Sequence, residues 1–501
     1  MELGTVISTL EGPSTTDFSF VVSNNKVRKG HFVQSETEEG LLIGAVTDIT
    51  RANRYFERAE SIAEYERGGE SLSKNFPTTD WEYVVANVRV LGVYSEGHLL
   101  RSTFPAAPGA KVSIADEKLL KGILGFDENG MLLGQLENHK LDVKVSLNRL
   151  LQKHFAILAM SGAGKSYLTS ILIEELLERK PEQGRVAVVV VDVHGEYTGF
   201  KSSPEYSSKT TIFEGRKIRI GLGKVSPQIL GEFLPELSSA QKRDIDSVLL
   251  ALRQEKKSKN ELFDLDDLIE KVGSSGMKET TKAPLLATLS SLKALRIFSK
   301  SDNPSVYELA QPGRLSVVDL SNIDNMRKKQ LLVAYFARKL FTARKKSRIP
   351  PFILLIEESH NFAKEKASKQ DMLSKSIVEK IAREGRKFGA SIGLISQRPV
   401  QLSTTALSQA NTHIIMRVTN PYDIKHIGEG CEALDESMLK SISTLRVGEA
   451  LLIGEAVNFP VFVKIRSRKS KKSTKGEEID VLARKFEELR EKKKADVEAF
   501  I

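Results

Sequence analysis

The chain has one cysteine in 501 residues and no long apolar run. The single cysteine, Cys431, excludes an intramolecular disulfide bond and a multi-cysteine metal site, which fits a reducing compartment. No stretch approaches the roughly 18 consecutive apolar residues that indicate a membrane-spanning helix. Residues 1–4 do not show the basic and then apolar pattern of a secretion signal. We therefore expect a cytoplasmic protein without a membrane partner.

Positive charge is in modest excess and is unevenly distributed. The formal net charge of +10 permits a polyanionic partner without demonstrating one. One segment near the C-terminus carries many cations and no acid, and the pattern leaves both a solvated linker and a nucleic-acid contact open. Its cations are Lys464, Arg466, Arg468, Lys469, Lys471, Lys472 and Lys475.

Residues 1–150 differ in texture from the rest of the chain. Short β-branched or alternating runs, for example at residues 18–22, 40–46 and 81–94, are separated by Gly, Asn and Pro. Several short strands with frequent turn signals are typical of a small barrel. We therefore predict an N-terminal β-barrel domain over residues 1–150.

From Phe155 onward, strand patterns alternate with helical patterns, which indicates an α/β domain with a mostly parallel sheet. The runs lack alternation, as strands buried on both faces do. Residues 225–300 show helical patterns and no comparable strand, so we predict a helical bundle inserted into an α/β domain that covers residues 151–463. Strands are expected at residues 155–159, 186–191, 315–320, 352–356, 391–395, 413–418 and 450–453.

Residues 464–501 are predicted to form a basic extension that ends in a helix. Ile479, Leu482, Phe486 and Leu489 recur at spacings of three and four, which gives the helix one apolar stripe. An apolar stripe of this width usually packs against another apolar surface. The pattern leaves its own domain and a neighbouring subunit open as partners.

A phosphate-binding loop is the most informative motif. An apolar strand pattern is interrupted by glycines and followed by a helical pattern. Glycines let backbone N–H groups turn toward phosphate oxygens, a lysine supplies a cation, and a serine hydroxyl is offered to Mg²⁺. Ala159 replaces the first glycine of the usual G-x-x-x-x-G-K-[ST] pattern. The loop residues are Ser161, Gly162, Ala163, Gly164, Lys165 and Ser166.

Two adjacent carboxylates, Glu357 and Glu358, end the apolar run at residues 352–356. Ligands of parallel sheets bind at the carboxyl ends of the strands, so both acids should face the same crevice as the phosphate-binding loop. We expect Glu357 to serve the metal and Glu358 to orient or deprotonate the attacking water. Another strand pattern ends likewise in a cluster of polar residues, Asp192 to Glu196.

Two arginines, Arg383 and Arg386, precede one strand pattern, and Gln397 follows it. Arginine can neutralise charge that develops on a transferred phosphoryl group, and glutamine can register whether that group is present. Surface arginines beside a glycine turn would give the same pattern. The spacing alone therefore leaves a purely structural role open for each arginine.

In their joint order, these motifs resemble those of HerA-type DNA translocases, which belong to the FtsK-HerA superfamily of P-loop ATPases. The resemblance covers essentially the whole chain, and it implies a RecA-like ATPase core with a helical insertion behind an N-terminal β-barrel. The motifs that carry it lie at residues 161–166, 192–197, 356–360, 381–389, 396–399 and 447–450.

The resemblance also implies site residues. It places the phosphate cradle at Ser161 through Tyr167, the Walker B pair at Glu357 and Glu358, and the polar sensor at Gln397. It assigns the arginine finger to Arg383 or Arg386 without separating them.

Three further positions follow from the resemblance. Lys153 stands where the family often has an arginine before the P-loop strand, and it keeps the charge without the bidentate fork. Lys464 and Ile465 resemble the segment that borders the adenine.

The expected protein is an ATP- and Mg²⁺-dependent motor that moves double-stranded DNA through a homo-hexameric ring. With a NurA-type nuclease as partner, it would act in DNA end resection and double-strand break repair. The basic loop with Lys364, Lys366, Lys369 and Lys375 is a candidate DNA grip, and a plain solvent loop is the alternative. An ATP-gated scaffold for a nuclease and a secretion or conjugation ATPase are the alternative functions.

Overall fold

The structure, a computed structural model, describes residues 1–8, 12–24, 26–53, 56, 59–67, 69, 81–366, 373–431, 434–473 and 479–498. The chain divides into two compact units. The first comprises Met1–Ser146, Ala433–Ser441 and Glu449–Arg466. The second comprises Leu147–Glu432, Ile442–Gly448 and Ser467–Ile501.

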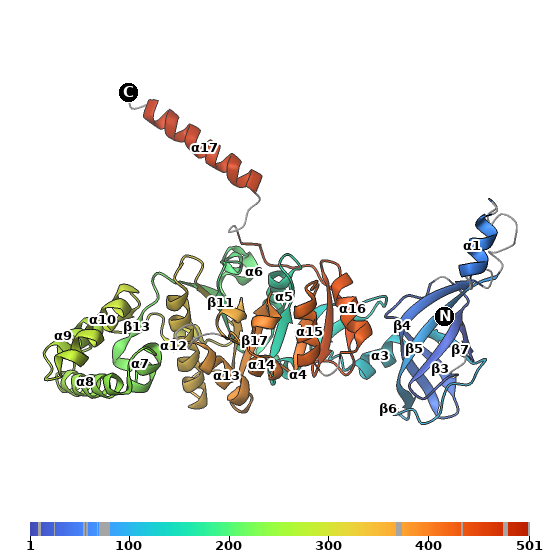
Figure 1. Ribbon diagram of the computed structural model, residues 1–501, viewed down its shortest axis with the longest axis horizontal. Coiled ribbons are helices and arrows are strands. Elements are labelled where there is room, and N and C mark those ends of the chain that lie inside the picture. Colours follow the sequence, from blue (N-terminus) through green and yellow to red (C-terminus); the bar gives the residue numbers. More distant parts are fainter. Residues whose placement is uncertain are drawn as a thin grey trace. The chain divides into compact units, whose positions relative to one another are not determined.

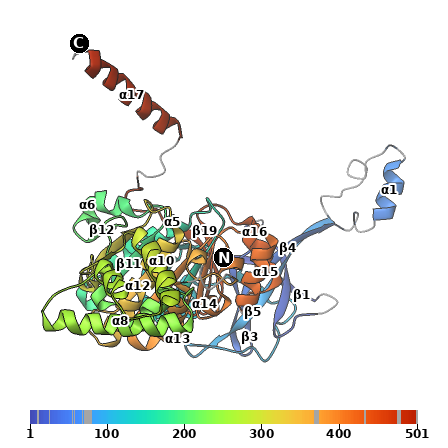
Figure 2. The same cartoon turned by 60° about the vertical axis from the view of Figure 1, so that its left-hand side comes forward.

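The first unit contains a closed antiparallel barrel (Figure 1, Figure 2). Its strand order is β2-β1-β7-β3-β4-β5, and β2 also pairs with β5, which closes the barrel. Alternate apolar side chains such as Leu3, Phe20 and Leu42 are buried in its core. The predicted N-terminal barrel is confirmed. Its strands are β1 Glu2–Ile7, β2 Asp17–Val22, β3 Phe32–Thr37, β4 Gly40–Asn53, β5 Glu82–Ser95 and β7 Lys111–Ile114, and β6 His98–Leu100 pairs with β5.

Four more strands of the first unit pair antiparallel in the order β19-β20-β8-β9. They join segments that are far apart in the sequence, because Val463 of β20 lies opposite Leu136 of β8. These elements are β8 Met131–Leu136, β9 Asp142–Val145, β19 Glu449–Gly454 and β20 Val461–Ile465, and the unit also has the helices α1 Ala59–Arg67 and α3 Glu117–Leu124.

The second unit is built on a parallel sheet with the order β12-β15-β11-β16-β17-β10-β18. Most of its strands are buried along their whole length, because both faces of the sheet are covered. The predicted α/β sheet is confirmed, although its edge strand β12 was not predicted. The strands are β10 Phe155–Leu158, β11 Ala187–Asp192, β12 Thr210–Glu214, β15 Leu315–Asp319, β16 Phe352–Ile356, β17 Ala390–Ser396 and β18 Thr412–Ile415.

Helices connect the strands of this sheet, as crossovers between parallel strands require. The longest is α12, in which residues such as Leu332 and Phe336 are buried. The helices are α4 Leu147–Leu151, α5 Lys165–Glu178, α6 Pro204–Ser207, α11 Val306–Leu309, α12 Met326–Lys345, α13 Lys375–Glu384, α14 Thr404–Ser408 and α15 Pro421–Gly430, and α16 Glu436–Thr444 spans both units.

A helical insertion interrupts the α/β unit, as predicted (Figure 1, yellow-green). Its apolar core includes Leu249, Leu268 and Leu289. At its base, Ile220 of β13 pairs with Phe298 of β14, so the outgoing and returning chain segments lie side by side. The elements are β13 Ile220–Gly221, α7 Pro227–Phe233, α8 Ser239–Ser258, α9 Leu265–Gly273, α10 Glu279–Ala294 and β14 Phe298–Ser299.

The predicted terminal helix is present as α17 Ile479–Glu498. The side chains of its stripe, Ile479, Leu482, Phe486 and Leu489, are all exposed, the least of them by 50%. The stripe is therefore not buried against the described residues of its own chain. Among the described residues, no helix is both long and apolar enough to span a membrane.

Candidate functional site

The phosphate-binding loop joins the end of β10 to the start of α5. Gly162 and Gly164 have φ values of 77° and 105°, in the left-handed region that favours glycine. A side chain on Gly164 would also meet the Met416 methyl group at 3.1 Å. Within the described chain, the N–H groups of Ser161, Gly162 and Gly164 donate to no protein acceptor. They are available to phosphate oxygens at a helix N-terminus.

Lys165 and Ser166 open α5, and each contacts one of the two predicted carboxylates. The Lys165 ammonium, which is buried, lies 3.6 Å from Glu358 Oε1. The Ser166 hydroxyl donates to Glu357 Oε1 over 3.5 Å. The structure thus brings together the loop and the carboxylates that the sequence placed at the same edge of the sheet.

Glu357 ends β16 in a buried and acidic environment. Its Oε2 accepts a hydrogen bond from Val193 N–H at 3.2 Å. Burial, and then the negative charges of Asp192 and Glu196, raise its pKa well above the usual carboxyl value. Burial likewise raises the pKa of Asp192, although the N–H groups of Gly195, Glu196 and Tyr197 donate to its carboxylate at 2.6 to 3.0 Å and oppose this effect.

This environment fits a divalent cation held by few protein ligands. Within the described part of the chain, no cation pairs with the buried carboxylate of Glu357, and the Ser166 hydroxyl next to it is a neutral oxygen ligand. Mg²⁺ prefers such oxygen ligands and usually keeps several waters and substrate phosphates in its shell. Among the described residues, no group of three or more His, Cys, Asp or Glu side chains is arranged to hold a metal by itself. Ser166 and Glu357 would therefore hold Mg²⁺ together with the nucleotide.

Glu358 differs from its neighbour in backbone and in partners. Its φ of 47° is left-handed, which is uncommon for a residue other than glycine and is typical of strained functional positions. The side chain is buried, yet Oε2 accepts no hydrogen bond from the described chain. That oxygen lies 3.3 Å from His360 Nδ1. One carboxylate oxygen is thus free to take a proton from a water molecule.

His360 stands behind Glu358 as a neutral ring. Burial, and then the charges of Arg398, Lys165 and Lys364, lower its pKa to about 4. Its Nδ1 lies 3.2 Å from the hydroxyl of Ser396, which also accepts the N–H of Arg398 at 3.0 Å. This chain of contacts fixes the segment in which Gln397 lies, half-buried, directly after β17.

The two arginines lie at the other edge of the sheet. Strands β10 and β17 run parallel, with Leu158 beside Ser396, so Gln397 is on the same edge as the phosphate-binding loop. Arg383 in the last turn of α13 and Arg386 just after it precede β17 and are exposed. The strand separates the two edges by about 20 Å, at about 3.3 Å per residue. The structure does not bring either arginine to the loop of its own chain.

Comparisons with known proteins show the family of this chain. A family model described as "Helicase HerA, central domain" matches residues 131–340. The DNA double-strand break repair helicase HerA of Pyrococcus furiosus is 30% identical, over 92% of this chain and 92% of that protein. The chain belongs to the HerA helicase family. It is accordingly an ATP-hydrolysing helicase.

Two further comparisons bear on family and fold. The DNA double-strand break repair helicase HerA of Saccharolobus solfataricus is 27% identical to this HerA-family chain, and the match covers 92% of both. The structure of VirB4 of Thermoanaerobacter pseudethanolicus superimposes with a TM-score of 0.54 at 15% identity, over 68% of this chain and 97% of that one. At that identity the likeness shows a shared fold alone.

The other three predicted nucleotide contacts of this HerA-family chain are not on the elements that form the phosphate-binding loop. Lys153 precedes β10, so it lies at the edge of the arginines and away from the loop of its own chain. Lys464 is exposed and Ile465 half-buried on β20 of the first unit. Their contacts with a nucleotide stay predictions.

The basic C-terminal segment is docked on the second unit, and the interpretation as a solvated linker is wrong for residues 467–473, which we call the strap. Glu174 in α5 is fully buried, and its Oε1 accepts hydrogen bonds from Lys469 N–H, Ser470 N–H and Ser470 Oγ at 2.6 to 2.9 Å. The N–H of Lys471 donates to Ser203 Oγ at 2.8 Å. The backbone of the strap, rather than its charge, makes these contacts. Lys475 lies outside the described residues.

The strap also reaches the neighbourhood of the phosphate-binding loop. Arg468 N–H donates to the hydroxyl of Tyr167 at 2.7 Å, one residue after Ser166. The Arg468 guanidinium packs over the ring of Phe200 at 5.6 Å, and burial lowers its pKa. Sequence reasoning missed this element. The one signal was Glu174, an acid among the apolar residues of a helix predicted to pack on the sheet.

Proposed function

We propose that this HerA-family helicase is an ATP-driven motor that moves double-stranded DNA through a homo-hexameric ring and serves a NurA-type nuclease in DNA end resection. The names of the relatives, DNA double-strand break repair helicases, support DNA as the substrate. One observation carries the ring: the arginines and the phosphate-binding loop of a single chain lie at opposite edges of the same sheet. A neighbouring copy would supply the missing cation.

The residues of the loop assign the steps of ATP hydrolysis. The N–H groups of Ser161, Gly162 and Gly164 would cradle the phosphates, and Lys165 would exchange its contact with Glu358 for one with them. Glu358 would then take a proton from the attacking water through its free Oε2. Mg²⁺, held by Ser166 and Glu357, would supply charge neutralisation at the phosphates. Gln397 would register the terminal phosphate from the end of the neighbouring strand β17.

An arginine in trans completes this arrangement. Arg383 and Arg386 are exposed, and within the described residues neither forms an ion pair. Lys153 shares their edge, so any nucleotide contact of Lys153 would also be with another subunit. The exposed stripe of α17 offers a further surface for contact with a neighbouring subunit.

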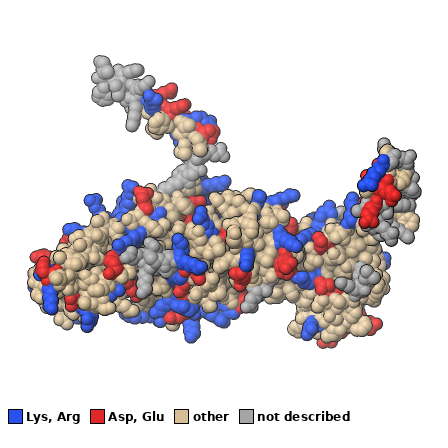
Figure 3. All heavy atoms as spheres, viewed as in Figure 1, with Lys and Arg blue, Asp and Glu red and all other residues tan. Residues whose placement is uncertain are grey.

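The DNA contacts would be made by exposed cations of loops. Lys364 and Lys366 are exposed, whereas Lys375 contacts Glu365 and Glu379. Lys369 lies outside the described residues. On the face seen in Figure 3, cations and acids are interspersed over the surface. Binding through phosphates alone predicts a steep salt dependence with a slope of about 0.9 per phosphate contact and little sequence preference, and a flat dependence would contradict a DNA motor.

A subunit-mixing experiment tests the shared site. Arg383→Ala and Arg386→Ala should each bind nucleotide, and the variant that lacks the finger should hydrolyse it roughly 10³-fold to 10⁵-fold more slowly. Mixing that variant with Lys165→Ala should restore ATPase activity, because some interfaces then join an intact loop to an intact arginine. Lys387→Ala, an exposed cation of the same turn, is the matched control and should stay active alone.

The outcomes separate the proposal from its alternatives. No recovery in mixed rings that native mass spectrometry confirms, or full activity in a monomer, would contradict a shared site. Three results together would favour an ATP-gated scaffold. The wild type would bind ATP normally, DNA would not stimulate its ATPase rate, and Glu358→Gln would not lower that rate. Resection of a DNA end by a NurA-type nuclease with and without the helicase tests the partnership.

A further inference from the structure

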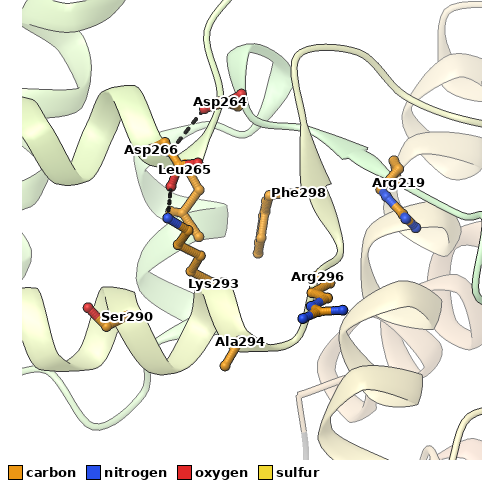
Figure 4. A pocket seen from close by; sticks show the side chains of 9 residues that line it. All are labelled: Arg219, Asp264, Leu265, Asp266, Ser290, Lys293, Ala294, Arg296 and Phe298. Atoms are coloured by element: carbon orange, nitrogen blue, oxygen red, sulfur yellow. Dashed lines mark hydrogen bonds and ion pairs between the residues drawn. The ribbon is translucent and has the colours of Figure 1, made fainter.

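The base of the helical insertion contains a pocket of about 460 Å³ that the phosphate-binding loop does not share. It lies where β13 leaves and β14 returns to the α/β unit. Phe298 stands between two unlike walls: Arg219 and Arg296 on one side, and the Lys293–Asp266 pair, 2.6 Å apart, on the other (Figure 4). The pocket thus combines an aromatic face, two guanidinium groups and a polar wall.

The two arginines of this pocket lack acidic partners. Within the described residues, neither Arg219 nor Arg296 forms an ion pair, whereas Lys293 pairs with Asp266. Arg219 Nη1 donates to the backbone oxygens of Arg216 and Ile218 at 2.6 and 2.8 Å, which fixes this side chain. Two guanidinium groups without acidic partners at one pocket favour an anionic ligand.

The backbone places Arg296 at the end of α10. Arg296 directly follows the C-cap residue Leu295 and has a φ of 53°, the left-handed conformation that commonly terminates a helix. Its N–H donates to the carbonyl of Lys293. The turn that ends α10 therefore places Lys293 and Arg296 at the same pocket.

We propose that this pocket binds a nucleoside phosphate, with the phosphate between Arg219 and Arg296 and the base on the ring of Phe298. Arginine matches phosphate through bidentate hydrogen bonds, and aromatic rings stack on any base. The Lys293–Asp266 wall offers a donor and an acceptor to the edge of the base. The volume lies within the range of small-ligand pockets. The bound nucleoside phosphate comes either from a free nucleotide or from single-stranded DNA.

Photo-crosslinking of the full-length protein tests the proposal. The probe is an oligothymidylate that carries 5-iododeoxyuridine, and mass spectrometry identifies the crosslinked peptide. We expect a crosslink at Phe298. Its yield should fall at least about fivefold in Phe298→Leu, which removes the stack, and about tenfold in Arg219→Gln, which removes a charged hydrogen-bond donor. Arg243→Gln, an exposed arginine of α8, removes the same charge outside the pocket and should not change the yield.

A second variant guards against misfolding, because the backbone of Arg219 pairs with that of Asn303. Arg296→Asn removes the other guanidinium and keeps a residue type that tolerates the left-handed region, and it should lower the yield similarly. Competition by free thymidine monophosphate would identify the free nucleotide as the source, and competition by unlabelled oligothymidylate alone would identify single-stranded DNA.

Three results would overturn the proposal: no crosslink at Phe298, a yield that both arginine substitutions leave unchanged, or equal competition by polyglutamate, which would indicate a general anion site. The readout involves no ATP hydrolysis. Failure of the proposed motor function would therefore leave this test intact, and the reverse also holds.

Discussion

The phosphate-binding loop and the strap both contact α5, but they differ in whether their backbone N–H groups have hydrogen-bond acceptors. In the loop, the N–H groups of Ser161, Gly162 and Gly164 find no acceptor in the described chain. In the strap, the N–H groups of Arg468 through Lys471 each donate to a protein side chain. Buried or converging donors need partners, so open donors indicate a ligand and occupied donors indicate a structural role. The same helix thus carries a binding site at its start and a clamp along its side.

The largest expected effect comes from a substitution in the phosphate-binding loop, three of whose N–H groups have no acceptor in the described chain. Lys165→Ala removes the cation that the phosphates would meet and leaves Glu358 buried without it. We expect the ATPase rate to fall by about 10³-fold, since a preorganised charge at the reacting phosphate is lost. Steady-state ATPase assays measure this, with Lys180→Ala as an exposed control. Trypsin resistance of the strap should not change, and a change would show that the two regions are not independent.

The docking of the strap is tested by substitution of Glu174, which accepts three of its hydrogen bonds. Glu174→Leu deprives the strap of one acceptor for three donors, and we expect its docking to lose about 2–4 kcal/mol. Glu174→Gln keeps an acceptor oxygen and should cost about 1 kcal/mol. The measurement is the rate of trypsin cleavage after Lys469, with Glu182→Gln as an exposed control. Equal cleavage of the wild type and Glu174→Leu would mean that other contacts hold the strap.

The difference between the two regions also explains what the sequence predicts. The loop, the buried strands and the carboxylates Glu357 and Glu358 follow from short patterns, because each depends on residues that are neighbours in the chain. Contacts across the chain leave no such pattern. Glu174 and Ser470 are 296 residues apart, and Lys469 and Lys471 suggest solvent or DNA when only charge is considered. Which strands are neighbours in the sheet, such as β10 and β17, likewise becomes visible only from strand pairing.

A third prediction concerns the buried negative charge of Glu357 beside the phosphate-binding loop. Because burial and neighbouring carboxylates raise the pKa of Glu357, folding favours its protonated form. This contribution to stability is complete at low pH and is lost as the pH rises toward the raised pKa, at about 1.4 kcal/mol per unit by which the pKa is raised. The buried His360, whose pKa is lowered to about 4, has the opposite sign, because its contribution to stability grows between about pH 4 and 6.5 and offsets part of the loss. Metal-free protein should therefore lose stability to Glu357 as the pH rises, and above about pH 6.5, where an unperturbed histidine is already neutral, the loss is free of the histidine contribution.

Thermal unfolding in EDTA from neutral to mildly alkaline pH measures this loss. Glu357→Gln should reduce it, because the substituted residue has no charge to bury. Asp192, whose pKa is also raised, should keep part of the slope. Glu358→Gln, which changes the adjacent carboxylate, is the matched comparison. An unchanged slope in Glu357→Gln would refute the assignment of the uncompensated charge to this residue.

The smallest expected effect distinguishes charge from backbone in the strap. Lys469 pairs with Glu178 at 2.7 Å, but both side chains are well exposed, at 51% and 38%. Exposed ion pairs contribute about 0–1 kcal/mol, so Lys469→Ala should weaken the docking by less than about 1 kcal/mol, although it removes one of the cations that made the segment conspicuous. Hydrogen exchange of the N–H groups of residues 468–471 measures the docking without a trypsin site at Lys469. Protection close to that of the wild type in Lys469→Ala, with loss in Glu174→Leu, would establish that occupied backbone donors hold the strap. A loss as large as that of Glu174→Leu would instead return the segment to an electrostatic role, and its lysines would again be candidates for contact with DNA.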